Sequence, residues 1–164
     1  IMKQGTKANK NGLSLEDSVE DCIVAHLFVP SERYSKTDLR EDILLKGVPY
    51  TNIYGSDRCR SEFVLCLEGR KIRIECKAQH SAGSVDEKLP YLYMNFTQTI
   101  EEEEAIIVIE GDGFKKGAKE WLRSMCKGTK VRVMSFDEFR EECLKGLPKP
   151  KKPSFFSRFF SIAD

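Results

Sequence analysis

Residues 72–79 read Ile-Arg-Ile-Glu-Cys-Lys-Ala-Gln, and this stretch decides the fold because it describes an unusual β-strand. Its apolar or small side chains stand at even positions, and its polar side chains stand at odd positions: Arg73, Glu75, Lys77 and Gln79. Successive side chains of a strand point to opposite faces, so the charged groups share one face. Charged groups are rarely buried unless they are paired or bind a metal. We therefore expect this face to border a cleft that contains ions.

The residues just before this strand predict its partner. Residues 62–67 form an apolar run that begins at Glu62, and Glu68-Gly69-Arg70-Lys71 follows as a turn. Two such segments joined by a short turn are typical of an antiparallel hairpin. The hairpin would bring Glu62 opposite residues 75–77, with the register open by a residue or two.

The remaining segments alternate between helical and strand patterns. Helices are expected from Ser14 to about Pro30, over Ser35 to Leu45, Glu87 to Gln98, Lys116 to Cys126 and Phe136 to Leu144. Strands are expected over Val48 to Tyr54, Ala105 to Ile109 and Val131 to Ser135. The strand–helix order in the C-terminal half favours parallel pairing there. Together these segments predict an α/β fold, a three-layer α/β/α sandwich around a mixed sheet of four to five strands.

Composition limits the class of protein without identifying it. The chain has 164 residues, a net charge of +1 and six cysteines, none of them in a C-x-x-C pair. We expect a flexible N-terminus over residues 1–12, one domain over 13–147, and a Lys/Pro linker with an aromatic tail over 148–164. No apolar run approaches the ~20 residues that span a bilayer, and no signal core precedes the domain. An intracellular protein, cytoplasmic or nucleoid-associated, with no contact with a membrane is therefore expected.

Carboxylates and one lysine converge in the predicted fold. Glu16 and Glu20 lie one turn apart on the first helix, and Glu62, Glu75 and Lys77 come from the hairpin. Mg²⁺ prefers hard oxygen ligands, which two carboxylates and the main-chain carbonyl of Cys76 would provide. Such a metal polarises a phosphoryl group, and Lys77 can stabilise charge or orient a water.

At this point the sequence resembles the PD-(D/E)XK nuclease superfamily, the restriction-endonuclease-like proteins. The pattern Glu62…Glu75-x-Lys77 is similar to the core of that superfamily, and the similarity extends over roughly residues 11 to 143. Other similar segments are Glu16 in the first helix, Ile74 to Gln79, Gly83 to Tyr91, and Gly111 to Lys115 followed by Trp121-Leu122.

The resemblance implies a Mg²⁺-dependent DNA endonuclease, in which Mn²⁺ may substitute for Mg²⁺. The implied catalytic residues are Glu62, Glu75, Lys77, Glu16 and Gln79, and the implied metal ligands are Glu62, Glu75, Glu16 and the main-chain carbonyl of Cys76. Lys88, Ser84, Lys71 and Arg73 are candidate DNA contacts. Double-stranded DNA is the expected partner, and a homodimer is the expected assembly.

One position departs from the superfamily's pattern. The first acid of its core is usually Asp, whereas here Arg60-Ser61-Glu62-Phe63 places Glu there. Asp57 is the competing candidate, but Phe63-Val64-Leu65 puts Glu62 on a strand, which favours Glu62. The preferred biological role is a site-specific, defence or homing endonuclease. The alternative is a catalytically impaired nucleic-acid-binding module on the same fold.

Overall fold

The computed structural model describes residues 14–36 and 41–150. The expected flexible segment 1–12 and the aromatic part of the tail lie outside the described residues. The elements follow one another in this order: α1 (Leu15–Leu27), β1 (Ser31–Arg33), β2 (Ile43–Tyr50), β3 (Cys59–Leu67), β4 (Arg70–Ala78), the short 3₁₀ helix η1 (Asp86–Lys88), α2 (Leu89–Gln98), β5 (Glu104–Glu110), α3 (Ala118–Cys126), β6 (Val131–Met134) and α4 (Phe136–Leu144). None of the helices in the described part of the chain has the length and apolar character needed to cross a membrane.

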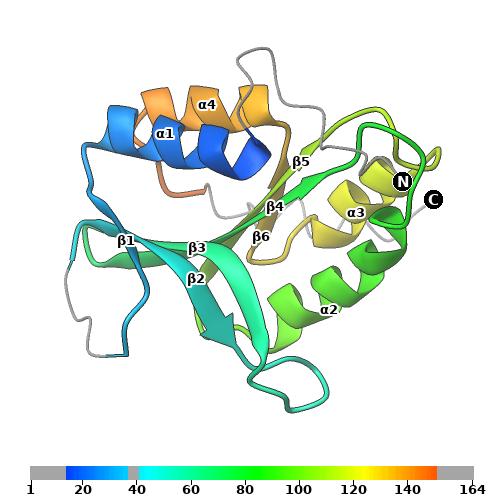
Figure 1. The fold of residues 1–164 in the computed structure, drawn as a ribbon, viewed down its shortest axis with the longest axis horizontal. Coiled ribbons are helices and arrows are strands. Elements are labelled where there is room, and N and C mark those ends of the chain that lie inside the picture. Colours follow the sequence, from blue (N-terminus) through cyan, green and yellow to red (C-terminus); the bar gives the residue numbers. More distant parts are fainter. Residues whose placement is uncertain (1–13, 37–40, 151–164) are drawn as a thin grey trace, which may run out of the picture.

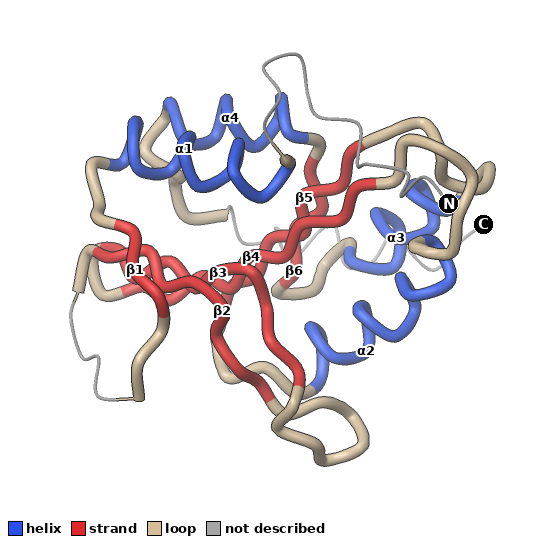
Figure 2. Tube along the Cα trace, viewed as in Figure 1, coloured by secondary structure: helices blue, strands red, loops and turns tan. Residues whose placement is uncertain are grey.

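The strands form one mixed sheet that separates two helical layers. Its six strands lie in the order β1-β2-β3-β4-β5-β6. The β2–β3 and β3–β4 pairs are antiparallel, whereas β1–β2, β4–β5 and β5–β6 are parallel. Helices α1 and α4 cover one face of the sheet, and α2 and α3 lie on the other (Figure 1, Figure 2). The expected three-layer α/β/α sandwich is therefore confirmed, although the sheet has six strands rather than four to five.

Strand β2 begins earlier than expected, because its first residues lie in a segment that we expected to be helical. The expectation of a helix over Ser35 to Leu45 is wrong, because β2 begins at Ile43. Leu44 packs into the cluster beneath α1, while Ile43 and Leu45 pack on the opposite side of the sheet. Three consecutive buried apolar residues thus belong to a strand that buries both of its faces.

Two apolar clusters fix the layers. Val19 and Ile23 of α1 pack with Phe139 of α4 over one face of the sheet. Phe96 of α2 and Leu122 of α3 pack over the other. Each of these five side chains is fully buried. In β5, Ile106 faces the first cluster and Ile107 the second, as expected for a continuous apolar strand covered on both sides.

Strands β3 and β4 separate part-way along their length. Their ladder runs from Leu67↔Arg70 to Phe63↔Ile74 and contains no pair beyond that point. The rest of β3 remains paired with β2 as far as Cys59↔Tyr50, and the rest of β4 remains paired with β5 as far as Ala78↔Glu110. The sheet therefore opens into a fork, and Glu62 and Glu75 are the first residues beyond the last pair.

Candidate active site

The carboxylate of Glu75 lies at the base of this fork and is held from two sides. It is 6% exposed. Its Oε1 accepts a hydrogen bond from Lys77 Nζ on the same strand face, and its Oε2 accepts from the backbone N–H of Glu62 at 3.3 Å. The backbone N–H of Glu62 thus bonds to a side chain of the neighbouring strand rather than to a backbone carbonyl.

Helix α1 brings a third carboxylate to the fork. Ser14 caps the helix: its side chain accepts from the backbone N–H of Asp17 at 3.1 Å, and Asp17 bonds back to the Ser14 N–H. Because Asp17 completes the capping box, the cap does not require Glu16. Glu16 and Glu62 instead line the same two clefts, one of them with Cys76 and Lys77 and the other with Lys46 and Arg60.

The pKa of Glu62 reflects this crowding of acids. Burial raises it from its ordinary value, and the negative charges of Glu75 and Glu16 raise it further, while Lys77 opposes the rise. The carboxylates of Glu16, Glu62 and Glu75 thus lie near enough to influence one another, and Lys77 is bonded to Glu75. A site of this kind attracts a cation.

Cys76 contributes no thiolate to the site. Its side chain is 3% exposed and belongs to the cluster beneath α1. Burial raises the pKa of its thiol well above the ordinary value, and Glu16, Glu75 and Glu62 add to the rise. A neutral, buried thiol is a poor metal ligand, so only the main chain of Cys76 could serve in that role.

The donor set suits a hard cation, although the side chains are not gathered around a single point. Within residues 14–36 and 41–150, no three Asp, Glu, His or Cys side chains lie close enough together to hold a metal ion. Both oxygens of Glu75 are engaged by protein donors. Mg²⁺ keeps several waters and needs only one or two carboxylates. Glu62 and Glu75 meet that requirement, with Glu16 and the Cys76 carbonyl as further oxygen donors.

Two other acids near the fork, Asp57 and Glu20, form hydrogen bonds outside it. Asp57 lies exposed in the loop between β2 and β3, where it accepts a hydrogen bond from Thr51 Oγ1. Glu20 accepts from Ser31 Oγ at 2.6 Å and from Lys46 Nζ at 2.7 Å, and so ties α1 to β1 and β2. The geometry thus favours Glu62 over Asp57 as the first acid of the fork.

Gln79 is bonded within the protein in a way that favours a positioning role, and its expected catalytic role stays a prediction. It is 5% exposed. Its Nε2 donates to the Gly113 carbonyl at 2.7 Å and to Asp86 Oδ1 at 3.4 Å, while its Oε1 accepts from the Val85 N–H at 2.7 Å. Both amide hydrogens are used, so none remains to bind a water or a phosphate. The side chain joins the end of β4 to the loop 80–85 and to the loop after β5.

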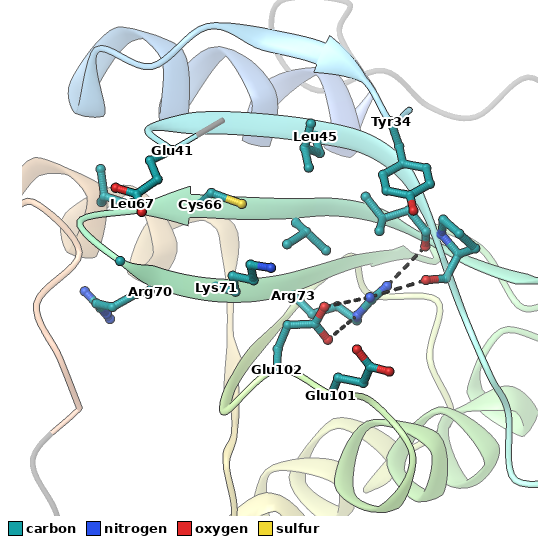
Figure 3. Close-up of a pocket in the computed structure, with 14 residues that line it drawn as sticks. Tyr34, Glu41, Leu45, Cys66, Leu67, Arg70, Lys71, Arg73, Glu101 and Glu102 are labelled. Atoms are coloured by element: carbon teal, nitrogen blue, oxygen red, sulfur yellow. Dashed lines mark hydrogen bonds and ion pairs between the residues drawn. The ribbon is translucent and has the colours of Figure 1, made fainter. Parts of the chain in front are cut away.

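Arg73 also forms its hydrogen bonds within the protein, which argues against the expected contact with DNA. Its side chain is 5% exposed and forms two hydrogen bonds of 2.8 Å with Glu102, which is 9% exposed. It also donates to the Val48 carbonyl at 3.1 Å and to Ser61 Oγ at 2.8 Å. Figure 3 shows Glu102 and Arg73 side by side in the lining of a pocket, joined by their hydrogen bonds. A guanidinium held in this way has no face left for a phosphate.

The other candidate DNA contacts lie at the surface. Lys71 is exposed near the hairpin turn, six residues along β4 from Lys77, which corresponds to about 20 Å of strand. Ser84 and Lys88 are exposed in the segment between β4 and α2. Their contact with nucleic acid stays a prediction.

Sequence reasoning missed the partners of the two arginines in β4. Glu102 and Glu104 belong to the acidic run Glu101–Glu104, which ends at the first residue of β5 and whose sequence is typical of a solvated loop or helix end. Arg70 pairs with Glu104 at 2.7 Å, and Arg73 pairs with Glu102. The parallel pairing of β4 with β5 could have revealed these ion pairs. Its register places Glu104 beside Ile72, between the two arginines in the sequence of β4.

A family model described as the PD-(D/E)XK nuclease superfamily domain matches residues 7–147. The chain belongs to the PD-(D/E)XK nuclease superfamily. The superfamily implies a hydrolase that acts on nucleic acid, and its members generally use divalent metals. Comparisons with curated proteins and with solved structures each gave no significant match.

Proposed function

We propose that this protein is a Mg²⁺-dependent DNA endonuclease whose active site is the fork between β3 and β4. The observation that carries the proposal is the meeting of Glu62, Glu75 and Lys77 where the β3–β4 ladder ends, with Glu16 of α1 beside them. Superfamily membership supports the reaction class. Double-stranded DNA is the proposed substrate, and a site-specific, defence or homing role is the proposed biology.

The residues of the fork would divide the work of hydrolysis. Glu62 and Glu75 would hold the ion, with oxygen from Glu16 and from the Cys76 main chain. The bound ion would supply Lewis acidity toward the phosphoryl oxygens and a more acidic water. Lys77, tethered to Glu75, would stabilise the charge that develops on the phosphoryl group. Water would add to phosphorus and lose a proton while the P–O3′ bond breaks, and the leaving 3′ oxygen would take up a proton. The products would be a 5′-phosphate and a 3′-hydroxyl.

The test is cleavage of supercoiled plasmid, linear duplex and single-stranded DNA by the purified chain in Mg²⁺, in Mn²⁺ and in EDTA. We expect cleavage with either ion and none in EDTA. Because outer groups of a metal site already contribute ~10–100-fold to activity, Glu75→Gln and Lys77→Met should each lose about 100-fold or more. Glu103→Gln and Lys127→Met, at exposed positions away from the fork, are the matched controls and should retain full activity.

Two results would contradict the proposal. Cleavage that survives Glu75→Gln and Lys77→Met would mean that the fork is not the active site. Binding of DNA that needs no divalent ion, survives both substitutions and never leads to cleavage would favour the alternative, a catalytically impaired binding module on the same fold.

A further inference from the structure

The loop between β2 and β3, residues 51–58, holds one tyrosine almost completely in solvent. Tyr54 is 80% exposed. Its ring stacks on the ring of Tyr91 in α2, with centroids 5.8 Å apart and an angle of 22° between the ring planes. One face of Tyr54 is therefore covered by a second aromatic ring, and the high exposure leaves the other face open. Figure 1 shows this loop protruding beside α2.

Two buried asparagines hold the loop in this conformation. Asn52 is 8% exposed, and its Oδ1 accepts from the backbone N–H groups of Tyr54 at 2.9 Å and Ser56 at 3.0 Å. Asn95 of α2 is fully buried and accepts from the Ile53 N–H at 2.9 Å. The backbone on both sides of Tyr54 is thus fixed before any ligand arrives, which lowers the entropic cost of binding to its ring.

The stacked pair adjoins the proposed active site. The Tyr91 hydroxyl lies 3.9 Å from Cys59 Sγ, at the start of β3. Tyr50, at the end of β2, pairs with Cys59 in the β2–β3 ladder, and the Arg73 guanidinium lies over its ring, 5.3 Å from the centroid. Glu75 lies two residues further along β4, on the same strand face as Arg73. A short run of side chains therefore connects the Tyr54–Tyr91 pair with the carboxylate of Glu75.

The surroundings are suited to a polyanion. Arg58 in the same loop and Lys88, three residues before Tyr91, are both exposed, and no ion pair is found for either among the residues the structure describes. Asp57, the acid of the loop, accepts a hydrogen bond from Thr51. Phosphate groups attract exposed lysine and arginine, while an open aromatic face stacks on any base.

We propose that the Tyr54–Tyr91 pair is a stacking platform for an unpaired nucleobase of the substrate, next to the phosphate that is cleaved. This inference rests on the proposed nuclease function and narrows its substrate. A base inside a continuous duplex has both faces covered by its neighbours, so the platform serves a nucleotide that has left the stack. Among double-stranded DNAs, the favoured substrates are therefore those whose strands separate at the cut, as at a fork.

The experiment measures binding in Ca²⁺, which we use to replace Mg²⁺ without supporting cleavage. The probes are a forked DNA that carries 2-aminopurine at its first unpaired position and a continuous duplex of the same sequence. Stacking on Tyr54 should quench the 2-aminopurine fluorescence. Because stacking of one base contributes ~1–3 kcal/mol, Tyr54→Ala should weaken fork binding by about 10-fold and abolish the quenching. Duplex binding should change little, and Tyr54→Trp should restore both signals.

Phe28→Ala is the matched control, because Phe28 is an 88% exposed aromatic at the far end of α1 from Glu16, roughly 18 Å along the helix. It should leave fork binding and quenching unchanged. If the wild-type chain cleaves DNA but Tyr54→Ala binds the fork as tightly and quenches as strongly, the platform is wrong and the nuclease proposal stands. If the wild-type chain neither binds nor cleaves any of these DNAs, both proposals fail.

Discussion

At the scale of single residues, Glu62 is where this chain departs from the pattern of its superfamily. Its backbone N–H bonds to the Glu75 carboxylate, and its own side chain shares two clefts with Glu16. A glutamate is one methylene longer than the aspartate usual at this place, so its carboxylate reaches further from the strand. Glu62 can therefore take the proposed metal-binding role only if the site requires a carboxylate and tolerates the longer side chain.

The need for a carboxylate at position 62 predicts the order of the cleavage rates of three variants. Glu62→Gln should lose about 100-fold or more in cleavage rate, because the amide keeps the size of the side chain and loses its charge. Glu62→Asp should lose less than Glu62→Gln, and Asp57→Asn should cleave at the wild-type rate. Initial cleavage rates in Mg²⁺, with thermal melting as a check of folding, would decide the order. A large loss in Asp57→Asn together with an active Glu62→Gln would transfer the role to Asp57.

The residues also show how far sequence reasoning reaches. Alternation along residues 72–79 singled out Glu75 and Lys77, and the structure places Lys77 in a cleft with Glu16 and Glu62. The same reasoning could not distinguish them from Arg73 and Gln79, which continue the same alternation. Arg73 forms an ion pair with Glu102. Gln79 forms hydrogen bonds with Val85, Gly113 and Asp86. The difference lies in hydrogen-bond partners outside the strand, two of them, Glu102 and Gly113, 29 and 34 residues away in the sequence, and alternation carries no information about them.

At the scale of elements, the Arg73–Glu102 pair joins strand β4 to the segment that precedes β5. The pair is nearly inaccessible, and Arg73 also lies over the ring of Tyr50, 5.3 Å from its centroid. Burial raises the pKa of Glu102, but the hydrogen bonds and charge of Arg73 outweigh burial and lower the pKa below its ordinary value. The folded state therefore holds this carboxylate in its charged form more firmly than the unfolded chain does.

A pH dependence of stability follows, and its sign is fixed. Because the folded pKa of Glu102 lies below the unfolded value near 4.5, the contribution is fully present above pH 4.5. It is lost as the pH falls through the folded pKa. Glu102→Gln should be destabilised by about 3–5 kcal/mol at pH 7, since it leaves a buried guanidinium without its partner charge.

Urea unfolding at neutral and acid pH measures this effect. The difference between wild type and Glu102→Gln should shrink on acidification, because the wild-type carboxylate then becomes neutral too. Glu101→Gln, at an exposed neighbouring position, is the control and should follow the wild type at every pH. A constant difference between wild type and Glu102→Gln across this range would contradict the argument.

Element prediction failed where periodicity could not separate two structures. The apolar run Ile43-Leu44-Leu45 follows Ser35 and Thr37, either of which could cap a helix. A short apolar run of this kind fits a buried helix as well as a buried strand. Tertiary packing decides in favour of the strand, since Leu44 is needed beneath α1 while Ile43 and Leu45 are needed on the other face. By contrast, β3, β4, β5 and α4 carried their own turn, cap or alternation signals and were predicted correctly.

At the scale of the whole molecule, the fork is formed by one sheet and one helix of a single chain. Helix α1 and the open ends of β3 and β4 supply every proposed catalytic group, and the family match spans this entire arrangement. The described part of the chain therefore contains one candidate site for the proposed DNA substrate. The two strands of a duplex run in opposite directions, so one site in one orientation addresses one strand.

We therefore propose that cutting of both strands requires a homodimer, in which a two-fold axis relates two sites as it relates the two DNA strands. At protein concentrations where sedimentation finds monomers, supercoiled plasmid should accumulate as nicked circles. Where dimers form, linear product should appear without a nicked intermediate. Mixing wild type with an excess of Glu75→Gln should convert double-strand cutting into nicking, since mixed dimers contain one working site. Linear product that forms at the same proportion from monomers, or that resists this excess, would mean that one chain cuts both strands in succession.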